Sequence, residues 1–176
     1  MNTQDKQYIE SVMRTIPDFP EPGIIFRDIT TALKDAEGLR IIMDDFIARY
    51  KGKQIDYVLG ADARGFIFGA AIAYAIGAGF VPARKPGKLP AEVVRVSYDL
   101  EYGSNTIEVH KDAFHEGANV LIVDDLLATG GTAHAMTELV EALGAKVYEL
   151  AFMIELEELK GRQVLAKYDV YSQLQY

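Results

Sequence analysis

Apolar residues along the chain occur with two spacings, which predicts strands alternating with helices. Short, mostly apolar runs predict strands at residues 57–60, 79–82, 120–123 and 146–153. Apolar residues three and four positions apart predict helices within residues 3–14, 31–50 and 133–143, and a segment rich in small residues predicts another at 66–76. Alternating strands and helices favour a parallel sheet with right-handed crossovers. We therefore expect an α/β fold, formed as a single domain over residues 1–176.

Two further segments alternate in polarity, as the arms of a β-hairpin do. They span residues 92–98 and 106–110, and residues 103–105 are expected to lie between them. The polar tip carries a carboxylate and a phenol, Glu101 and Tyr102. A lid over an active site has to be soluble when open and to exclude water when closed, which such a hairpin suits. A solvated hairpin tip without a function is the alternative.

The most distinctive segment follows the apolar run at 120–123. Two carboxylates, Asp124 and Asp125, are expected where that strand leaves the sheet. The next residues supply hydroxyls, closely spaced backbone N–H groups and two glycines free to take positive φ: Ala128, Thr129, Gly130, Gly131 and Thr132. A strand, a small polar loop and a helix N-terminus together predict a phosphate-binding site.

The two carboxylates restrict which phosphate compound fits this loop. They would repel a bare phosphate, so the ligand should present hydroxyls or a metal ion beside its phosphate. A ribose 5-phosphate fits, with its hydroxyls donating to Asp124 and Asp125. The segment matches neither the G-x-G-x-x-G nor the G-x-x-x-x-G-K-[ST] pattern, which argues against dinucleotide and nucleoside triphosphate sites. A plain strand–turn–helix connection with two surface aspartates is the alternative.

Composition and charge exclude several classes of protein. The chain has no cysteine, which excludes thiolate metal sites and favours the cytoplasm. No apolar run approaches the roughly 20 residues that span a bilayer, and the polar N-terminus lacks a signal-peptide pattern, so no membrane association is expected. A net charge of −8 argues against nucleic-acid binding. The three histidines have no zinc-ligand spacing. Cations that fall between two apolar segments of this acidic chain suggest an anion site, with solvated loop side chains as the alternative: Arg64, Arg84, Lys85 and Lys88.

The segment 124–132 resembles the phosphoribosyl diphosphate (PRPP) signature of the type I phosphoribosyltransferase family. Further blocks resemble the adenine-specific branch of that family, in the family's order: residues 19–30, 63–66, 84–90 and 100–103. The resemblance implies a type I phosphoribosyltransferase-like fold, with a central, mostly parallel sheet flanked by helices. It also implies a flexible β-hairpin flap and a small N-terminal base-binding hood. A homodimer is implied as well, with Lys85 as the basic residue that could reach the partner's site.

The activity that the resemblance implies is purine salvage, with transfer of the 5-phosphoribosyl group of PRPP to adenine N9. AMP and pyrophosphate would be the products. Adenine would be bound by Ile25, Phe26 and Arg27, and the ribose 5-phosphate by Asp124, Asp125 and the loop that follows them. The diphosphate would be bound by Asp62, Ala63, Arg64, Arg84, Lys85, Lys88 and Tyr102.

Two residues would be catalytic in this interpretation. Glu101 would act as general acid/base at the purine, and Arg64 would donate to the diphosphate. Mg²⁺ would arrive with PRPP and remain mostly unligated by the protein. The family usually has glutamate where this chain has Asp62, in a loop that often contains a non-proline cis peptide.

Two alternatives remain open at the level of the sequence. One is a phosphoribosyltransferase for another base. The other is a PRPP-binding regulator that keeps the fold without catalysis. Such regulators usually carry a DNA-binding helical domain, for which the residues before Phe19 leave no room.

Overall fold

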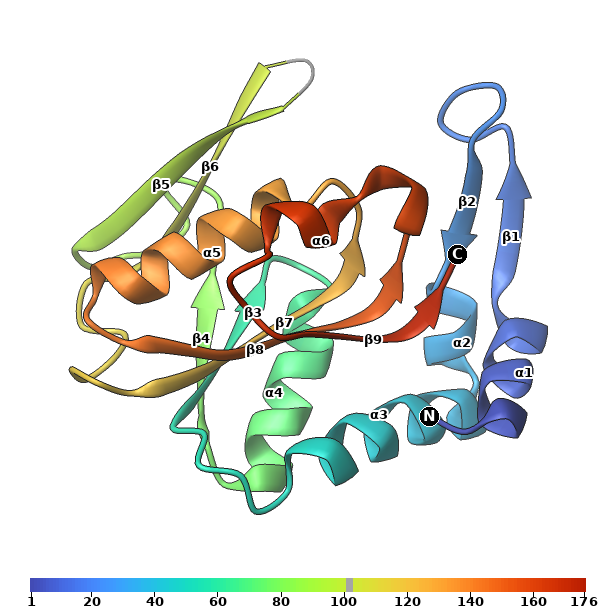
Figure 1. The fold of residues 1–176 in the computed structure, drawn as a ribbon, viewed down its shortest axis with the longest axis horizontal. Coiled ribbons are helices and arrows are strands. Elements are labelled where there is room, and N and C mark those ends of the chain that lie inside the picture. The colour runs from blue at the N-terminus through green and yellow to red at the C-terminus, as the bar shows by residue number, and fades with distance from the viewer. Residues whose placement is uncertain (101–102) are drawn as a thin grey trace. The chain divides into compact units, whose positions relative to one another are not determined.

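The computed structural model describes residues 1–100 and 103–176. The chain forms two compact units, Met1–Arg49 and Tyr50–Tyr176, and each is described by itself (Figure 1). The expectation of a single domain over residues 1–176 stays a prediction.

The first unit combines short helices with a two-stranded antiparallel ribbon. Its elements are α1 (Thr3–Val12), β1 (Arg14–Pro17), β2 (Ile25–Asp28), α2 (Thr30–Lys34) and α3 (Ala36–Tyr50), whose last residue belongs to the second unit. The predicted helix over residues 3–14 ends at Val12, and the one over 31–50 is divided in two. The division lies at Asp35, whose carboxylate accepts a hydrogen bond from the Gly38 N–H (2.7 Å) and so satisfies a free donor at the start of α3. The ribbon was not predicted, because its four-residue strands contain no buried residue and carry no clear alternation.

The second unit is built on a five-stranded parallel sheet in the order β4-β3-β7-β8-β9. Its strands are β3 (Tyr57–Ala61), β4 (Gly79–Ala83), β7 (Asn119–Leu127), β8 (Lys146–Glu155) and β9 (Val170–Gln175). The helical elements are α4 (Gly65–Ile76), α5 (Gly131–Ala142), the 3₁₀ turn η1 (Glu157–Leu159) and α6 (Gly161–Val164). This architecture confirms the predicted α/β class. β9 was not predicted from the apolar pattern.

Helices cover both faces of this sheet (Figure 1). The crossover through α4 leads from β3 outward to β4, whereas the crossover through α5 leads from β7 the opposite way to β8. Because such crossovers are right-handed, opposite steps place α4 and α5 on opposite faces. Residues Val120–Val123 of β7, between the two layers, are fully buried. The expectation of a strand buried on both faces is confirmed there. Gly144, with φ +75°, follows α5 as predicted.

β7 is longer than the sequence predicted. It continues to Leu127 because β8 pairs with it along this stretch, as Asp124 with Phe152 and Leu126 with Ile154. Asp124 and Asp125 therefore lie within the strand, and the prediction that they follow it was wrong. A strand held by backbone pairing on one side tolerates polar side chains at its carboxyl end.

The predicted hairpin is present as β5 (Val93–Leu100) and β6 (Gly103–His110). It projects beyond the five-stranded sheet (Figure 1). Its arms are longer than predicted, because cross-strand pairing continues from Val93 with His110 as far as Leu100 with Gly103. Residues 103–105 accordingly belong to β6, and their placement in the connection was wrong.

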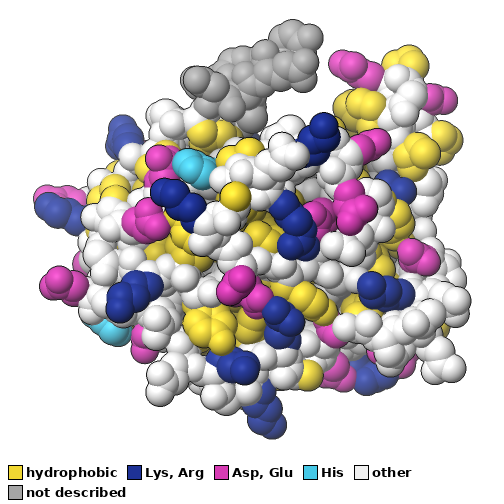
Figure 2. All heavy atoms as spheres, in the orientation of Figure 1, with side chains coloured by type: hydrophobic (Ala, Val, Ile, Leu, Met, Phe, Trp, Pro, Cys, Tyr) yellow, Lys and Arg dark blue, Asp and Glu magenta, His cyan; other side chains and the backbone are white. Residues whose placement is uncertain are grey.

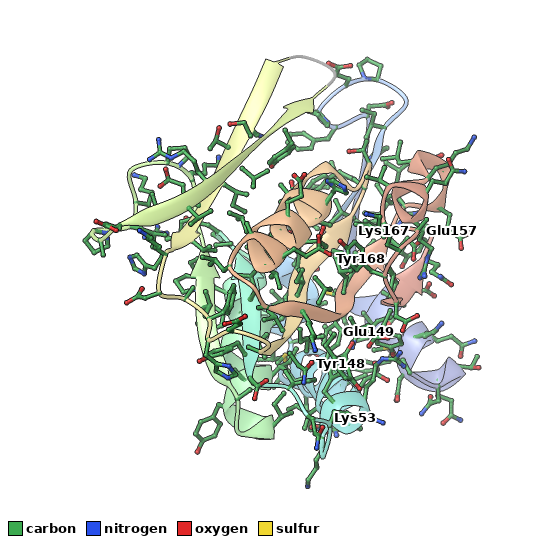
Figure 3. The ribbon with its side chains drawn as sticks, turned by 60° about the vertical axis from the view of Figure 1, so that its left-hand side comes forward. Lys53, Tyr148, Glu149, Glu157, Lys167 and Tyr168 are labelled. Carbon is green, nitrogen blue, oxygen red and sulfur yellow. The ribbon has the colours of Figure 1, made fainter. Side chains whose placement is uncertain are left out.

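Within the described residues, no helix is both long enough and apolar enough to cross a bilayer. Cationic and acidic side chains are interspersed on the face that Figure 2 shows. At the base of the second unit, the Tyr50 hydroxyl donates to the buried carboxylate of Glu149 (2.7 Å), which Figure 3 labels on β8.

Candidate active site

The adjacent strands β3 and β7 mark the point where the crossovers diverge. In open parallel sheets, ligands bind beyond the carboxyl ends of the strands at such a point. A cavity of about 450 Å³ opens there. Predicted residues from both strand ends and from the segment after β4 line it: Asp62, Ala63, Arg64, Arg84, Lys85, Asp124, Asp125 and Thr132. The fold therefore brings together side chains that are up to 70 positions apart in the sequence.

The two carboxylates on β7 differ in their surroundings. The Asp125 carboxylate pairs with the Arg64 guanidinium, with 2.7 Å between Oδ2 and Nε. The Asp124 carboxylate accepts the backbone N–H of Asp125 (2.9 Å). Burial raises the pKa of Asp124 well above its ordinary value, and the neighbouring Asp125 carboxylate raises it further. Burial also raises the pKa of Asp125, although Arg64 opposes that rise. Hydroxyl donors or a cation in the cavity would stabilise both ionised forms.

A second cavity, of about 80 Å³, lies over the loop between β7 and α5. All the predicted loop residues line it: Ala128, Thr129, Gly130, Gly131 and Thr132. Gly130 has φ +87°, which favours glycine, and its carbonyl accepts the His134 N–H at 2.8 Å. Asp124 and Thr132 line both cavities, so the two are adjacent. This arrangement suits a ligand with hydroxyl groups at one end and a phosphate at the other.

The loop 128–132, predicted to bind phosphate, is supported by a segment that the sequence analysis missed. A Cβ atom on Gly161 would overlap the Ala128 carbonyl oxygen, and one on Gly130 would come within 2.8 Å of the Gly161 carbonyl oxygen. The two backbones therefore pack directly against each other. Arg162 holds this segment by binding the Glu155 carboxylate through Nε and Nη2 (2.6 and 2.7 Å). The signal available in the sequence was Glu155, two residues after the apolar run 146–153, followed seven residues later by Arg162.

Cationic residues gather on the other side of the larger cavity. Arg84 donates from Nε to the Asp62 carboxylate (2.9 Å) and from Nη1 to the Lys88 carbonyl oxygen (3.3 Å). Both lysines are exposed, but Lys85 lines the cavity and Lys88 does not. The peptide between Asp62 and Ala63 is cis. These contacts make Asp62 a partner of Arg84.

The segment after Arg84 is also anchored to the hairpin. Arg84 and Glu108 exchange two backbone hydrogen bonds of 2.8 and 2.9 Å. The Glu108 carboxylate, which is 1% exposed, accepts the Gly87 N–H at 3.2 Å. Sequence reasoning also missed Glu108, because a buried acid next to a cationic loop is visible only in the fold.

The remaining predicted residues lie elsewhere. Ile25, Phe26 and Arg27 form most of β2 in the first unit. There the Phe26 ring packs edge-on against Phe19, with 5.2 Å between ring centroids, and Ile25 is 54% exposed. Glu101 and Tyr102, the predicted tip of the flap, lie outside the described residues.

The donors at the cavity fit a hydrated Mg²⁺ better than a metal bound by the protein. Carboxylate oxygens are the ligands that Mg²⁺ prefers, and Asp124 and Asp125 supply them. The Asp125 carboxylate is already paired with Arg64. In the described part of the chain, no group of three or more His, Cys, Asp or Glu side chains could hold a metal ion.

Comparison with known proteins shows the family to which the chain belongs. Residues 30–174 match the family described as the phosphoribosyl transferase domain. The adenine phosphoribosyltransferase of Acidobacterium capsulatum is 56% identical over 168 residues, which cover 96% of this chain and 93% of that protein.

Solved structures give the same result. The adenine phosphoribosyltransferase of Thermoanaerobacter pseudethanolicus superposes with a TM-score of 0.92 at 49% identity, covering 97% of this chain and 99% of that one. The enzyme of Saccharomyces cerevisiae, complexed with D-2,5-dideoxy-2,5-imino-altritol 1,6-bisphosphate and adenine, also has a TM-score of 0.92, at 40% identity over 98% of this chain and 99% of its own. The chain therefore belongs to the adenine phosphoribosyltransferases, within the family of the phosphoribosyl transferase domain.

Proposed function

We propose that this protein is a purine salvage enzyme that transfers the 5-phosphoribosyl group of PRPP to N9 of adenine and releases pyrophosphate and AMP. One observation carries the proposal in this chain. The carboxylate pair Asp124–Asp125 lies between a phosphate loop on one side and cationic residues on the other. PRPP has the same order of groups, with a 5′-phosphate, two ribose hydroxyls and a diphosphate.

The ribose 5-phosphate is bound at β7 and the loop after it. Asp124 and Asp125 accept from the ribose hydroxyls, and the residues between Ala128 and Thr132 bind the phosphate. Backbone N–H groups at the start of α5 add the favourable end of the helix dipole. Because hydroxyl donors stabilise carboxylates whose pKa burial has raised, the free site is arranged for a ligand that supplies them.

The diphosphate is bound by the opposite side of the cavity. Arg64, Arg84 and Lys85 provide its cations, together with the backbone at Ala63. Lys88, whose carbonyl oxygen accepts from Arg84, adds a further cation. Mg²⁺ carried by PRPP would neutralise part of the diphosphate charge. The carboxylates on β7 would accept hydrogen bonds from the water molecules bound to it. Asp62 positions Arg84 through their hydrogen bond.

The adenine ring is bound by the first unit. Phe26 stacks on the base, Ile25 offers backbone groups to its Watson–Crick edge, and Arg27 is nearby. Support comes from the exposure of Ile25 and from the edge-on Phe19 ring that supports Phe26. The Saccharomyces cerevisiae relative, whose chain superposes over nearly its whole length, is complexed with adenine.

Catalysis depends on orientation and on charge stabilisation. The C1′–oxygen bond to the diphosphate breaks, the diphosphate leaves with the electron pair, and C1′ forms a bond to N9. Water would intercept the positive charge that develops at C1′, so it has to be excluded, which is the role of the flap that carries Tyr102. Glu101 accepts the N9 proton, and Arg64 stabilises the departing diphosphate.

The test is an assay with Mg-PRPP and each of five bases: adenine, hypoxanthine, guanine, xanthine and orotate. We expect AMP and pyrophosphate in equal amounts with adenine and little product with the others. Preference for a 6-oxo purine would show that this purine, and not adenine, is the substrate. PRPP binding without turnover of any base would identify a regulator. A Glu101→Gln variant should lose kcat while it keeps its affinity for PRPP.

The protein is also proposed to act as a homodimer in the cytoplasm, the compartment that a cysteine-free sequence favours. An exposed apolar stripe along α4 supports the dimer, with Tyr74 91% and Ile67 47% exposed and Ala70 and Ala71 between them. Lys85 is the residue proposed to reach the partner's site. Light scattering should give twice the chain mass for the native protein, and Tyr74→Glu should reduce it toward that of one chain. A native monomer would remove this proposal.

A further inference from the structure

A hydrogen bond joins the hairpin to the phosphate loop. The Tyr98 hydroxyl on β5 and the Thr132 hydroxyl at the start of α5 are 2.8 Å apart. The Tyr98 ring also covers the neighbouring glycine, because a Cβ atom on Gly131 would lie 3.2 Å from it. Tyr98 and Thr132 both line the larger cavity. One side chain thus contacts both the backbone and a hydroxyl of the loop.

The direction of this hydrogen bond is open in the free protein, since either hydroxyl can donate. A bound phosphate removes that freedom. Phosphate oxygens at neutral pH are acceptors, so the Thr132 hydroxyl has to donate to them. The Tyr98 hydroxyl then donates to Thr132, and two O–H groups point in sequence from the hairpin to the phosphate. Hydrogen bonds in such a chain polarise and strengthen one another.

We propose that Tyr98 is a positioning residue of the phosphate site. Its hydroxyl orients the Thr132 hydroxyl toward the 5′-phosphate. Its ring packs on the backbone at Gly131 and so keeps that part of the loop in place. The role rests on the proposed function, because it requires a phosphate in this loop. Tyr98 acts on the 5′-phosphate through Thr132 and has no part in binding pyrophosphate.

The adjacent residue on β5 provides a matched control. The Ser97 hydroxyl is 2.8 Å from the Thr106 hydroxyl, so it also forms a hydrogen bond between side chains. That bond stays within the hairpin and is exposed. Tyr98→Phe and Ser97→Ala therefore each remove one hydroxyl from neighbouring positions of the same strand, but only the first removes a bond to the phosphate loop.

Binding to the full-length protein by calorimetry tests the proposal, with ribose 5-phosphate and pyrophosphate as separate probes. We expect Tyr98→Phe to weaken ribose 5-phosphate by about three- to tenfold, the scale of one lost hydrogen bond. Pyrophosphate affinity should stay unchanged, and the KM for PRPP should rise more than kcat falls. Ser97→Ala should leave both affinities at the native value. Equal weakening of both probes by Tyr98→Phe, or no weakening of ribose 5-phosphate, would overturn the proposal.

A second variant tests whether Tyr98 acts through Thr132. In a Thr132→Val background, Tyr98→Phe should have almost no further effect on ribose 5-phosphate, because the two changes remove the same chain of hydrogen bonds. Independent, multiplying effects would contradict the proposal. If the native protein failed to bind ribose 5-phosphate, or if Thr132→Val left it unchanged, the assignment of the phosphate to this loop would fail as well. Native binding that depends on Thr132 but not on Tyr98 would refute only the role of Tyr98.

Discussion

The guanidinium of Arg64 and the carboxylate of Asp125 form an ion pair, with 2.7 Å between Nε and Oδ2. The pair links the loop after β3, proposed to bind diphosphate, to the strand proposed to bind ribose. Its members come from different sides of the expected ligand, so the position of each depends on the other. Arg64 is about half exposed and Asp125 is largely buried, which leaves the arginine free to extend to a diphosphate oxygen.

This pairing predicts that Arg64 and Asp125 act as a unit. Arg64→Gln and Asp125→Asn should each lower kcat/KM for PRPP by roughly 10- to 100-fold, the scale of a charged hydrogen bond. The double variant should have a kcat/KM only slightly below that of the more impaired single variant, because either change disrupts the same contact. Steady-state kinetics of the three variants at saturating adenine provide the measurement. Strictly multiplying effects would show that the two residues contribute separately.

The buried carboxylate of Asp124 predicts a conflict between stability and function. Its pKa is raised by burial and by Asp125, so the folded state binds this proton more tightly than the unfolded state does. The stability that this tighter proton binding contributes to the folded state is fully present below pH 3.8, the ordinary pKa. It is lost as the pH rises through the folded-state pKa. Above pH 3.8 the raised pKa therefore makes the free protein less stable than it would be with an unshifted carboxyl at this position. Asp124→Asn should raise the Tm at pH 7 to 8 while it lowers PRPP affinity.

Melting curves of the ligand-free protein between pH 5 and 8 check the sign of this effect. The Tm advantage of Asp124→Asn should shrink as the pH falls. The carboxyl of the native protein then takes up a proton, and the cost of burying its charge disappears. Asp112→Asn, at an exposed aspartate, is the control. A Tm difference independent of pH, or a less stable Asp124→Asn protein at pH 8, would contradict the assignment.

The close packing of Gly161 predicts a specific loss of phosphate affinity. In Gly161→Ala the new methyl group would overlap the Ala128 carbonyl oxygen, so the loop backbone has to move. We expect ribose 5-phosphate to bind at least about tenfold more weakly, together with a loss of stability of roughly 1–3 kcal/mol. Pyrophosphate affinity should change less.

Gly77→Ala is the matched control for this change. Gly77 has φ +78° and no atom within 4 Å of a Cβ, so alanine there is strained without contacting the phosphate loop. It should lower the Tm and leave ribose 5-phosphate affinity unchanged. Equal affinity losses in the two variants would show that general destabilisation, rather than displacement of the loop, is responsible.

The hydrogen bond between Arg84 and Asp62 predicts how diphosphate binding depends on Asp62, which stands where the family usually has glutamate. Removing its charge in Asp62→Asn reduces repulsion of the diphosphate but also weakens the contact that orients Arg84. We expect orientation to dominate, because a charge-assisted bond of 2.9 Å contributes about 1.5–3 kcal/mol. Pyrophosphate should bind about three- to tenfold more weakly to Asp62→Asn. Asp62→Glu, which can keep the bond, should bind it nearly as well as the native protein does. Tighter binding by Asp62→Asn would show that repulsion is the larger effect.

The elements that the sequence predicted well are those whose apolar pattern is local and strong. The run 120–123 predicted the buried centre of β7, and the small residues over 66–76 predicted α4. Their limits were less predictable, because partners elsewhere in the chain decide them. β7 continues through Asp125 since β8 pairs with it. α3 begins after α2 since the Asp35 side chain accepts a backbone hydrogen bond.

By itself, the sequence determined the α/β class, and it placed the loop proposed to bind phosphate next to the two carboxylates, since these depend on residue types at short spacing. Only the tertiary structure decided how distant groups pair. It joined Arg64 to Asp125, Arg84 to Asp62 and Tyr98 to Thr132, and it packed Gly161 against the loop. The physical reason is that hydrogen bonds and steric contacts act over a few ångströms. The fold sets those distances between residues that are 22 to 61 positions apart in the chain.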